Sequence, residues 1–451
     1  MEDKNLELLE QASVPKAILK LSLPTVLSTV VSLLYNLTDT YFIGLLDDPV
    51  QLGAISLAFP VFLVIQAIGN VFGNGAPSYI SRCLGARRME EVKRAGCVSV
   101  YIAVLATLGM TLLYFCFQQP VLRLLGTSPD TIGPTGEYLG IVVGFSAVMT
   151  MQVILSALLR AESRIKEAAA GVIIGTILNV VFDPVFIFVF RLGVAGAAWA
   201  TIIGNACAAG YYLIVYQKRG TALSLAPQDF RPSRRILGEV LKIGLPASAA
   251  QILMSFCTVL VNNLAAGYGD YVISAYGVAG KLSNMVYMLV LGYVSGYMPF
   301  AGYHYGAGNW ERMLEAFRFT WITATGGSLV LLAPYLLLAR PFMEAFTSVE
   351  EIIQVGMVFL FAQAWSVPLL GTQFIVMCTF QATGSAGRAM IVNLGRQSVF
   401  YIPLIFWFRS LWGLTGLIYS YMAADVVTTV AAVALAIPLL RRLRGEGKQR
   451  A

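Results

Sequence analysis

The chain has 451 residues, of which 57% are hydrophobic and only 12% are charged. Soluble domains carry about twice that share of charged residues, so this composition excludes an ordinary soluble protein and indicates one that faces lipid. The formal net charge of +7 does not indicate a nucleic-acid partner, because the basic residues lie in the connections between apolar segments.

Twelve apolar segments follow one another, each long enough to cross about 30 Å of hydrocarbon as a helix. We predict an all-α integral membrane protein with spans at 17–45, 52–82, 95–117, 135–159, 167–190, 194–217, 237–267, 271–303, 313–338, 350–380, 387–408 and 413–440. The polar stretch 218–235 predicts a cytoplasmic linker between an N-lobe, 1–217, and a C-lobe, 236–440. Residues 441–451 would form a basic cytoplasmic tail.

Lys and Arg gather at both ends of the chain and in every second connection. The alternate connections hold only Arg123, Arg191, Arg340 and Arg409. Cytoplasmic loops carry the excess of Lys and Arg, so we expect both termini in the cytoplasm. The first apolar run is too long for the core of a cleavable signal peptide. The sequence therefore predicts a multi-pass protein of the bacterial inner (plasma) membrane.

The two halves align at an offset of 220 to 222 residues. The matched pairs are Leu23-Pro24 with Leu245-Pro246, Gly85-Ala86 with Gly306-Ala307, Gln152 with Gln373, Ala161 with Ala382, and Gly193-x-x-Gly196 with Gly413-x-x-Gly416. Matches held in register over this length indicate a duplication. Six spans per half give both halves the same orientation, and such parallel repeats build transporters with a site near the membrane midplane.

Two acids lie within the predicted spans of the first half, Asp39 and Asp183. Asn36 precedes Asp39 by three residues and Asn179 precedes Asp183 by four, so each pair shares a helix face. Ionisable residues at membrane depth are costly and mark function by default. These oxygens could form a cage for Na⁺, or two close carboxylates could share a proton. The alternative for Asp39 is a solvated position at the outer end of its helix.

The second half lacks this acidic pair, since Val261 or its neighbours align with Asp39, and Ile402, at an offset of 219 set by Pro184 and Pro403, aligns with Asp183. We therefore expect ion coupling to reside in the first half. Asp425, which aligns with Asn205, is either a substrate contact or a hydrogen-bonded structural acid, and Lys281 could pair with it or extend to the membrane surface.

Polar and soft side chains within the spans suggest a substrate cavity. Surfaces rich in Met and aromatic residues adapt to varied apolar ligands, although such residues at helical spacing also serve plain packing. The residues that we expect to line the cavity are Gln152, Met149, Gln251, Met254, Tyr287, Gln373 and Asp425.

No enzyme motif is found. A GxxxxGK[ST] phosphate loop is missing, and one histidine cannot supply a His-based triad or zinc site. The six cysteines show neither a CxxC nor a cluster. We expect no enzyme activity, no cofactor apart from a coupling ion, Na⁺ or H⁺, and no ATP site in this chain.

Several segments together resemble the multidrug and toxic compound extrusion (MATE) family of antiporters. They are Leu23-Pro24, Asn36-x-x-Asp39 with Phe42-Ile43-Gly44, Leu84-Gly85-Ala86, Asn179-x-x-x-Asp183-Pro184, Gly193-Val194-Ala195-Gly196-Ala197-Ala198, Gly244-Leu245-Pro246, and Arg396 before Pro403. The resemblance implies a V-shaped pair of pseudo-symmetric six-helix bundles that alternate between inward- and outward-open states.

The resemblance also implies export of organic cations or other amphipathic compounds in exchange for Na⁺ or H⁺. The cation site of one family branch matches Asp39, Asn179, Asp183 and Thr201, with Na⁺ possible at the first three. Another branch uses an acid in the seventh span, where this chain has Gln251.

The alternative function is a flippase or exporter of lipid-linked precursors from the same wider superfamily. Such a protein would need several cations within the membrane to hold pyrophosphate, and this chain offers only Lys281 and Arg396. We therefore favour the exporter. Its expected partners are small amphipathic or cationic substrates and membrane lipids, with no nucleic acid and no obligatory protein partner.

Overall fold

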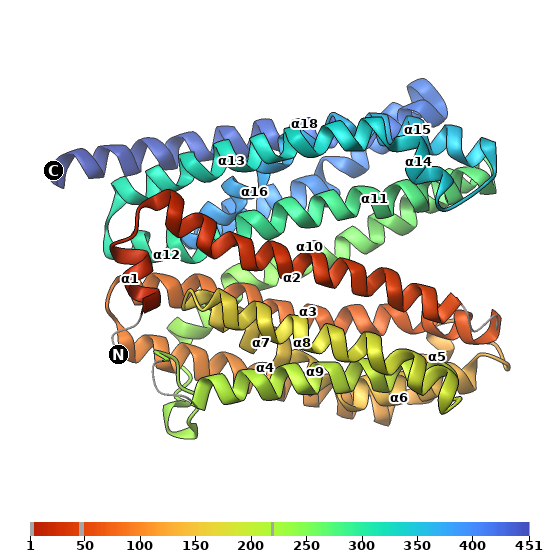
Figure 1. The fold of residues 1–451 in the computed structure, drawn as a ribbon, viewed down its shortest axis with the longest axis horizontal. Helices are drawn as coiled ribbons and strands as arrows, with labels where there is room; N and C mark the ends of the chain where they lie inside the picture. Colours follow the sequence, from red (N-terminus) through yellow and green to blue (C-terminus); the bar gives the residue numbers. More distant parts are fainter. Residues whose placement is uncertain (1–3, 45–48, 218–220, 451) are drawn as a thin grey trace. The chain divides into compact units, whose positions relative to one another are not determined.

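The computed structural model describes residues 4–44, 49–217 and 221–450, and within these ranges every regular element is a helix (Figure 1). The side chains of some helical residues, Asn36 and Asp39 among them, lie outside the described part. The elements of the first half are α1 (Lys4–Glu10), α2 (Val14–Gly44), α3 (Pro49–Gly85), α4 (Met89–Cys116), α5 (Gln118–Leu124), α6 (Ile132–Gly144), α7 (Ser146–Ala161), α8 (Ile165–Pro184), the π-helix η1 (Val185–Val189) and α9 (Gly193–Gln217).

A short 3-10 turn, η2 (Pro227–Asp229), lies in the linker between the halves. The elements that follow it are α10 (Arg234–Ala266), α11 (Asp270–Ser295), α12 (Tyr297–Ala307), α13 (Trp310–Leu337), α14 (Ala339–Glu344), α15 (Glu350–Ala364), α16 (Val367–Ala382), α17 (Ala386–Leu394), the π-helix η3 (Gly395–Val399) and α18 (Tyr401–Arg450).

The described helices include nine that are long and apolar enough to cross a membrane. Two further pairs form bent spans, α6 with α7 at 47° and α15 with α16 at 49°. Helix α18 is itself interrupted at Gly413, whose φ of 58° and ψ of −129° are not helical. The eleventh predicted span, 387–408, runs through α17, η3 and the start of α18, and the twelfth, 413–440, begins at Gly413. The predicted all-helical membrane fold is therefore confirmed.

The two bends have local causes. Between α6 and α7 the carbonyl of Val143 accepts hydrogen bonds from the hydroxyls of Thr111, at 3.0 Å, and Ser146, at 2.7 Å. A carbonyl that loses its helical partner must be satisfied within a membrane, so these hydroxyls permit the bend. At the other bend, Pro368 stands in the first turn of α16, where its missing N–H costs nothing.

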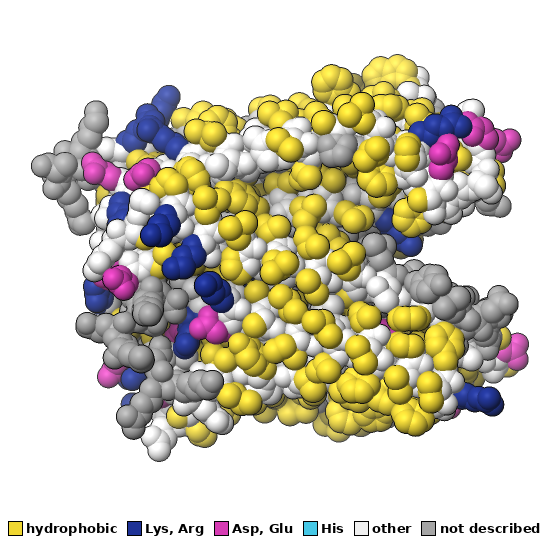
Figure 2. Space-filling model, viewed as in Figure 1, with side chains coloured by type: hydrophobic (Ala, Val, Ile, Leu, Met, Phe, Trp, Pro, Cys, Tyr) yellow, Lys and Arg dark blue, Asp and Glu magenta, His cyan; other side chains and the backbone are white. Residues whose placement is uncertain are grey.

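In each part of the molecule hydrophobic side chains cover most of the face shown in Figure 2, and charged side chains gather near the helix ends. Such a surface suits lipid along the length of the helices and water at their ends. This distribution agrees with a multi-pass membrane protein.

By contacts the chain divides into two compact units. The first comprises Met1–Glu10 and Leu27–Ser248, and the second comprises Gln11–Val26 and Ala249–Ala451. These limits differ from the predicted lobes at the ends of two helices: the start of α2 belongs to the second unit and the start of α10 to the first. For α10 the reason is close backbone packing, because a Cβ atom at Gly244 or Gly75 would collide with α3 or α10, respectively.

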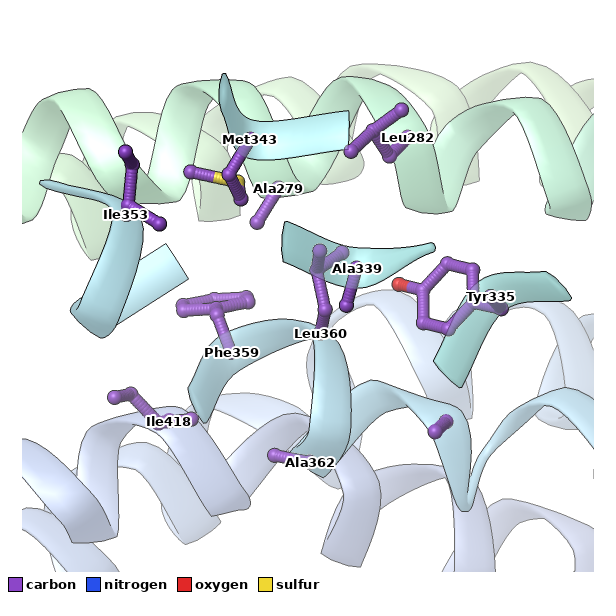
Figure 3. Close-up of a cluster of buried hydrophobic side chains, with 11 residues drawn as sticks. Ala279, Leu282, Tyr335, Ala339, Met343, Ile353, Phe359, Leu360, Ala362 and Ile418 are labelled. Carbon is purple, nitrogen blue, oxygen red and sulfur yellow. The ribbon is translucent and has the colours of Figure 1, made fainter. Parts of the chain in front are cut away.

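Each unit has its own apolar core. In the first, Ile65, Leu139 and Val142 are buried together from α3 and α6. In the second, the core draws on α11 and α13–α15, where Met343 and Ala279 meet Phe359 and Leu360 (Figure 3). These cores position the helices whose polar side chains form the sites described next.

Candidate functional site

Helices α8 and α9 approach each other to backbone distance. A Cβ atom at Gly204 would lie 2.6 Å from the carbonyl oxygen of Gly175, and one at Gly175 would lie 2.9 Å from that of Gly204. Only glycine permits such an approach. Its consequence is that Asn179, one turn beyond Gly175, lies against Thr201 of α9.

Asn179 links Asp183 to Thr201 inside the first unit. Asp183 is fully buried and Asn179 is 4% exposed. In the orientation that gives both the nitrogen and the oxygen of the Asn179 amide a hydrogen-bond partner, the nitrogen donates to Asp183 Oδ2 at 2.9 Å. The amide oxygen then accepts from the Thr201 hydroxyl at 3.2 Å and from the Thr201 backbone N–H at 3.0 Å. An ionised carboxylate favours this orientation, because it can only accept hydrogen bonds.

The opposite orientation of the same amide is unfavourable. Its nitrogen would then face the backbone N–H of Thr201 at 3.0 Å, and its oxygen would face the Asp183 carboxyl. Two donors or two acceptors in contact cannot form a hydrogen bond. The geometry therefore fixes the Asn179 amide with its nitrogen toward Asp183.

A cavity of about 430 Å³ opens beside this triad, within the first unit. Polar and apolar side chains of α2, α3 and α6–α9 enclose it. Its lining residues are Ser32, Tyr35, Ile55, Phe59, Phe62, Gln66, Tyr138, Gln152, Val172, Gly175, Thr176, Asn179, Ala197, Thr201, Asn205 and Ala208. The predicted Gln152, Asn179 and Thr201 are among them, and Asp183 adjoins it through Asn179.

The family comparison settles the class of protein. The MatE family model matches residues 24–185 and again residues 246–407. The chain belongs to the MATE family. The two matches lie in the two halves at the offset expected from the sequence, so the predicted duplication is confirmed. Because this is a family of transporters, the chain is a transport protein by descent.

Relatives of this MATE protein match along its whole length. It is 31% identical over 443 residues to the multidrug export protein MepA of Staphylococcus aureus (strain NCTC 8325 / PS 47), with 98% of each chain covered. The MepA protein of Staphylococcus haemolyticus (strain JCSC1435) is 29% identical over the same length.

Solved structures agree with the fold. A MATE structure in complex with MaL6 has a TM-score of 0.93 at 25% identity and covers 98% of this chain and 99% of that one. A transporter of the MOP superfamily from Pyrococcus furiosus Vc1 (DSM3638) has a TM-score of 0.90 at 25% identity, with 99% of both chains covered.

Not every residue expected to line a substrate cavity lines this one. Met149 is 4% exposed and packs in the apolar core of the first unit. Gln251 and Met254 are exposed on α10 in the second unit. Asn36 and Asp39 lie on α2, but their side chains are outside the described residues.

The other three expected cavity residues meet around Arg396 in the second unit. Arg396 Nε donates to Asp425 Oδ1 at 2.6 Å, and Arg396 Nη2 donates to the Tyr421 hydroxyl at 2.8 Å. Gln373 Nε2 donates to the backbone oxygen of Asp425 at 2.9 Å. The guanidinium carbon lies 4.6 Å from the centroid of the Tyr287 ring. Asp425 thus pairs with Arg396, while Lys281 is exposed on α11.

Sequence reasoning missed several cavity residues, among them Tyr35, Gln66, Tyr138 and Thr176. Each is a polar residue within an apolar span, which was the available signal. Sequence position alone does not tell which face of a span looks into a cavity and which packs against a neighbouring helix.

Proposed function

We propose that this MATE protein is a secondary active transporter that exports organic cations or other amphipathic compounds in exchange for Na⁺ or H⁺ by alternating access. The main observation in support is the buried arrangement of Asp183, Asn179 and Thr201 beside a polar cavity in the first unit. A carboxylate buried at membrane depth is costly, and the family supplies the context in which ion coupling requires it.

The donor set suits either coupling ion. Asp183, Asn179 and Thr201 offer carboxylate, amide and hydroxyl oxygens, the hard ligands that Na⁺ prefers. A proton carried by the Asp183 carboxyl would instead serve as the coupling ion. In either case the ion can bias the transport cycle only through a different affinity for the two states. Asp39 and Asn36, on the helix that lines the same cavity, belong to the proposed ion site.

The cavity suits small amphipathic substrates. Its volume of about 430 Å³ lies in the range of pockets that hold drug-sized ligands. Aromatic side chains, including Phe59, Phe62 and Tyr138, line it beside the polar groups. Aromatic faces near a carboxylate favour cations, and MepA is named for multidrug export.

The alternative function, flipping of a lipid-linked precursor, has less support. A pyrophosphate would need unneutralised cations in the membrane. Among the described residues, Arg396 is engaged with Asp425 and Lys281 is exposed. The proposed topology places both termini in the cytoplasm, on the Lys and Arg distribution.

The test is transport by the purified chain without nucleotide. Proteoliposomes loaded with a fluorescent organic cation should export it when an ion gradient is imposed, and an ionophore that collapses the gradient should stop export. Export that requires ATP, or that survives the ionophore unchanged, would contradict the proposal.

A further inference from the structure

The backbone gives the repeat an accurate register. Ser163 and Gly384 have positive φ angles of 61° and 71°, and Gly193 and Gly413 have positive φ angles of 54° and 58°. Only a few of the described residues have a positive φ angle, so its recurrence at matching places marks equivalent positions in the two halves. These anchors bracket α8 in the first half and α17 with η3 in the second.

This register equates the Arg396 cluster with the lining of the N-terminal cavity. The anchors at Ser163 and Gly384 pair Arg396 with Gly175, and those at Gly193 and Gly413 pair it with Thr176. The remaining pairs are Gln373 with Gln152, Tyr421 with Thr201, and Asp425 with Asn205. Every first-half member of these pairs lines the cavity of about 430 Å³.

In the second unit the equivalent space is nearly filled. The cavity beside Arg396 and Tyr421 measures about 20 Å³, room for roughly one water molecule. The first half has glycine or threonine where the second has arginine. The long side chain of Arg396 therefore occupies the place that the cavity has in the first unit.

The surroundings of Arg396 are those of a cation-binding site. Asp425 supplies a carboxylate at 2.6 Å. Three aromatic rings face the guanidinium, with centroids 4.6 Å away for Tyr287, 5.5 Å for Tyr421 and 6.0 Å for Phe374. A charge-assisted hydrogen bond combined with aromatic faces is a general way of holding an organic cation.

The site also offers acceptors that Arg396 does not use. Asp425 is fully buried and Gln373 is 2% exposed. Asp425 Oδ2 and Gln373 Oε1 have no hydrogen-bond partner among the residues that the structure describes. Buried acceptors left unpaired are costly, so a cation that could also reach them would be bound more favourably than the tethered one.

We propose that the second unit contains a cation-binding site of the same construction as the N-terminal cavity, which the chain fills with its own Arg396 guanidinium. In the intact protein this unit then takes neither a coupling cation nor a cationic substrate, and exchange is confined to the first unit. Without the Arg396 side chain, the site binds guanidinium compounds. The confinement of exchange to the first unit rests on the proposed transport function, whereas the cation-binding site itself is inferred from the contacts of Arg396 and the register of the repeat.

The experiment is chemical rescue of Arg396→Ala, which removes the equivalent of one ethylguanidinium ion. Thermal unfolding of the purified full chain is followed with ethylguanidinium or with NaCl at the same ionic strength. We expect the variant to have a lower Tm than wild type, and ethylguanidinium to raise that Tm saturably, by mass action. Wild type, whose site is filled, should show no such rise.

The double variant Arg396→Ala/Asp425→Ala is the matched control. It lacks the carboxylate, and we expect ethylguanidinium to leave its Tm unchanged. Absence of rescue in Arg396→Ala, or equal rescue in the double variant, would overturn the proposal. If Arg396→Ala yields little folded protein, Arg396→Met is extracted with and without ethylguanidinium. Greater recovery of folded protein with the compound supports the site, and equal recovery refutes it.

Both readouts measure binding and stability, so they are independent of transport. A chain that exported nothing could still show rescue, and a functional exporter could fail to show it. Failure of the proposed function and failure of this site are therefore distinguishable.

Discussion

Asp183→Asn isolates the charge of the proposed ion site from its shape. The substitution keeps the size of a side chain that is fully buried and lies 2.9 Å from the Asn179 amide. Exchanging one hydrogen bond changes stability by about 0.5–1.5 kcal/mol, and removing a buried charge offsets part of that cost. For a unit of this size, about 1 kcal/mol shifts Tm by roughly 2–4 °C, so we expect a change of a few degrees.

The effect on transport should be much larger than the effect on Tm. Coupling free energies between sites are typically about 1–3 kcal/mol, or roughly 5–150-fold. Without the charge, the ion loses the differential affinity by which it biases the cycle. We therefore expect ion-driven efflux to fall by at least about tenfold, and Asp39→Asn to act in the same direction.

The assay is efflux of a fluorescent organic cation from proteoliposomes at matched protein content, with Tm and substrate binding measured on the same preparations. Glu137→Gln, an equal change at an exposed position of α6, should transport like wild type. Full efflux by Asp183→Asn would refute the ion-site reasoning. Lost efflux that merely follows a large loss of folded protein would assign Asp183 a structural role instead.

Other predictions concern stability and topology. Asp425→Asn leaves its arginine partner buried without a counter-charge, which costs about 3–5 kcal/mol, so Tm should fall while efflux per folded molecule stays above that of Asp183→Asn. Gly204→Ala should cost about 1–3 kcal/mol in thermal unfolding, because its Cβ would lie 2.6 Å from a carbonyl oxygen of α8; Gly210→Ala, which has open space, should be neutral. Reporter fusions at Ala451 and within 218–235 should both read cytoplasmic, and a periplasmic signal at either would overturn the topology.

The fold was largely predictable because membrane-spanning helices can be recognised in a sequence from their length and hydropathy. The two bends were not predictable. One depends on a hydroxyl that hydrogen-bonds to the Val143 carbonyl, and the other on the position of Pro368 in the first turn of α16. The assignment of the start of α10 to the first unit was not predictable either. It depends on the contacts of Gly244 and Gly75 with particular backbone atoms, and hydrophobic periodicity does not reveal such contacts.

Some of the residues expected at the site line the cavity and others do not, and the difference has a physical pattern. Met149 and Gln152 lie three residues apart on α7, and periodicity places them near the same helix face. Packing then separates them: Met149 is buried in the apolar core, whereas Gln152 lines the cavity. Likewise Asp425 was recognised as a buried acid, but its partner Arg396 comes from a different helix, and such pairing requires coordinates.

The most direct test of the account is uphill export under one imposed ion gradient at a time. Proteoliposomes contain the fluorescent cation at equal concentrations inside and out, and either an inward Na⁺ gradient or an inward H⁺ gradient is applied without nucleotide. The account predicts that at least one gradient drives the cation against its own gradient in wild type and fails to do so in Asp183→Asn. No net export of the cation under either ion gradient, or equal uphill export by the variant, would contradict it.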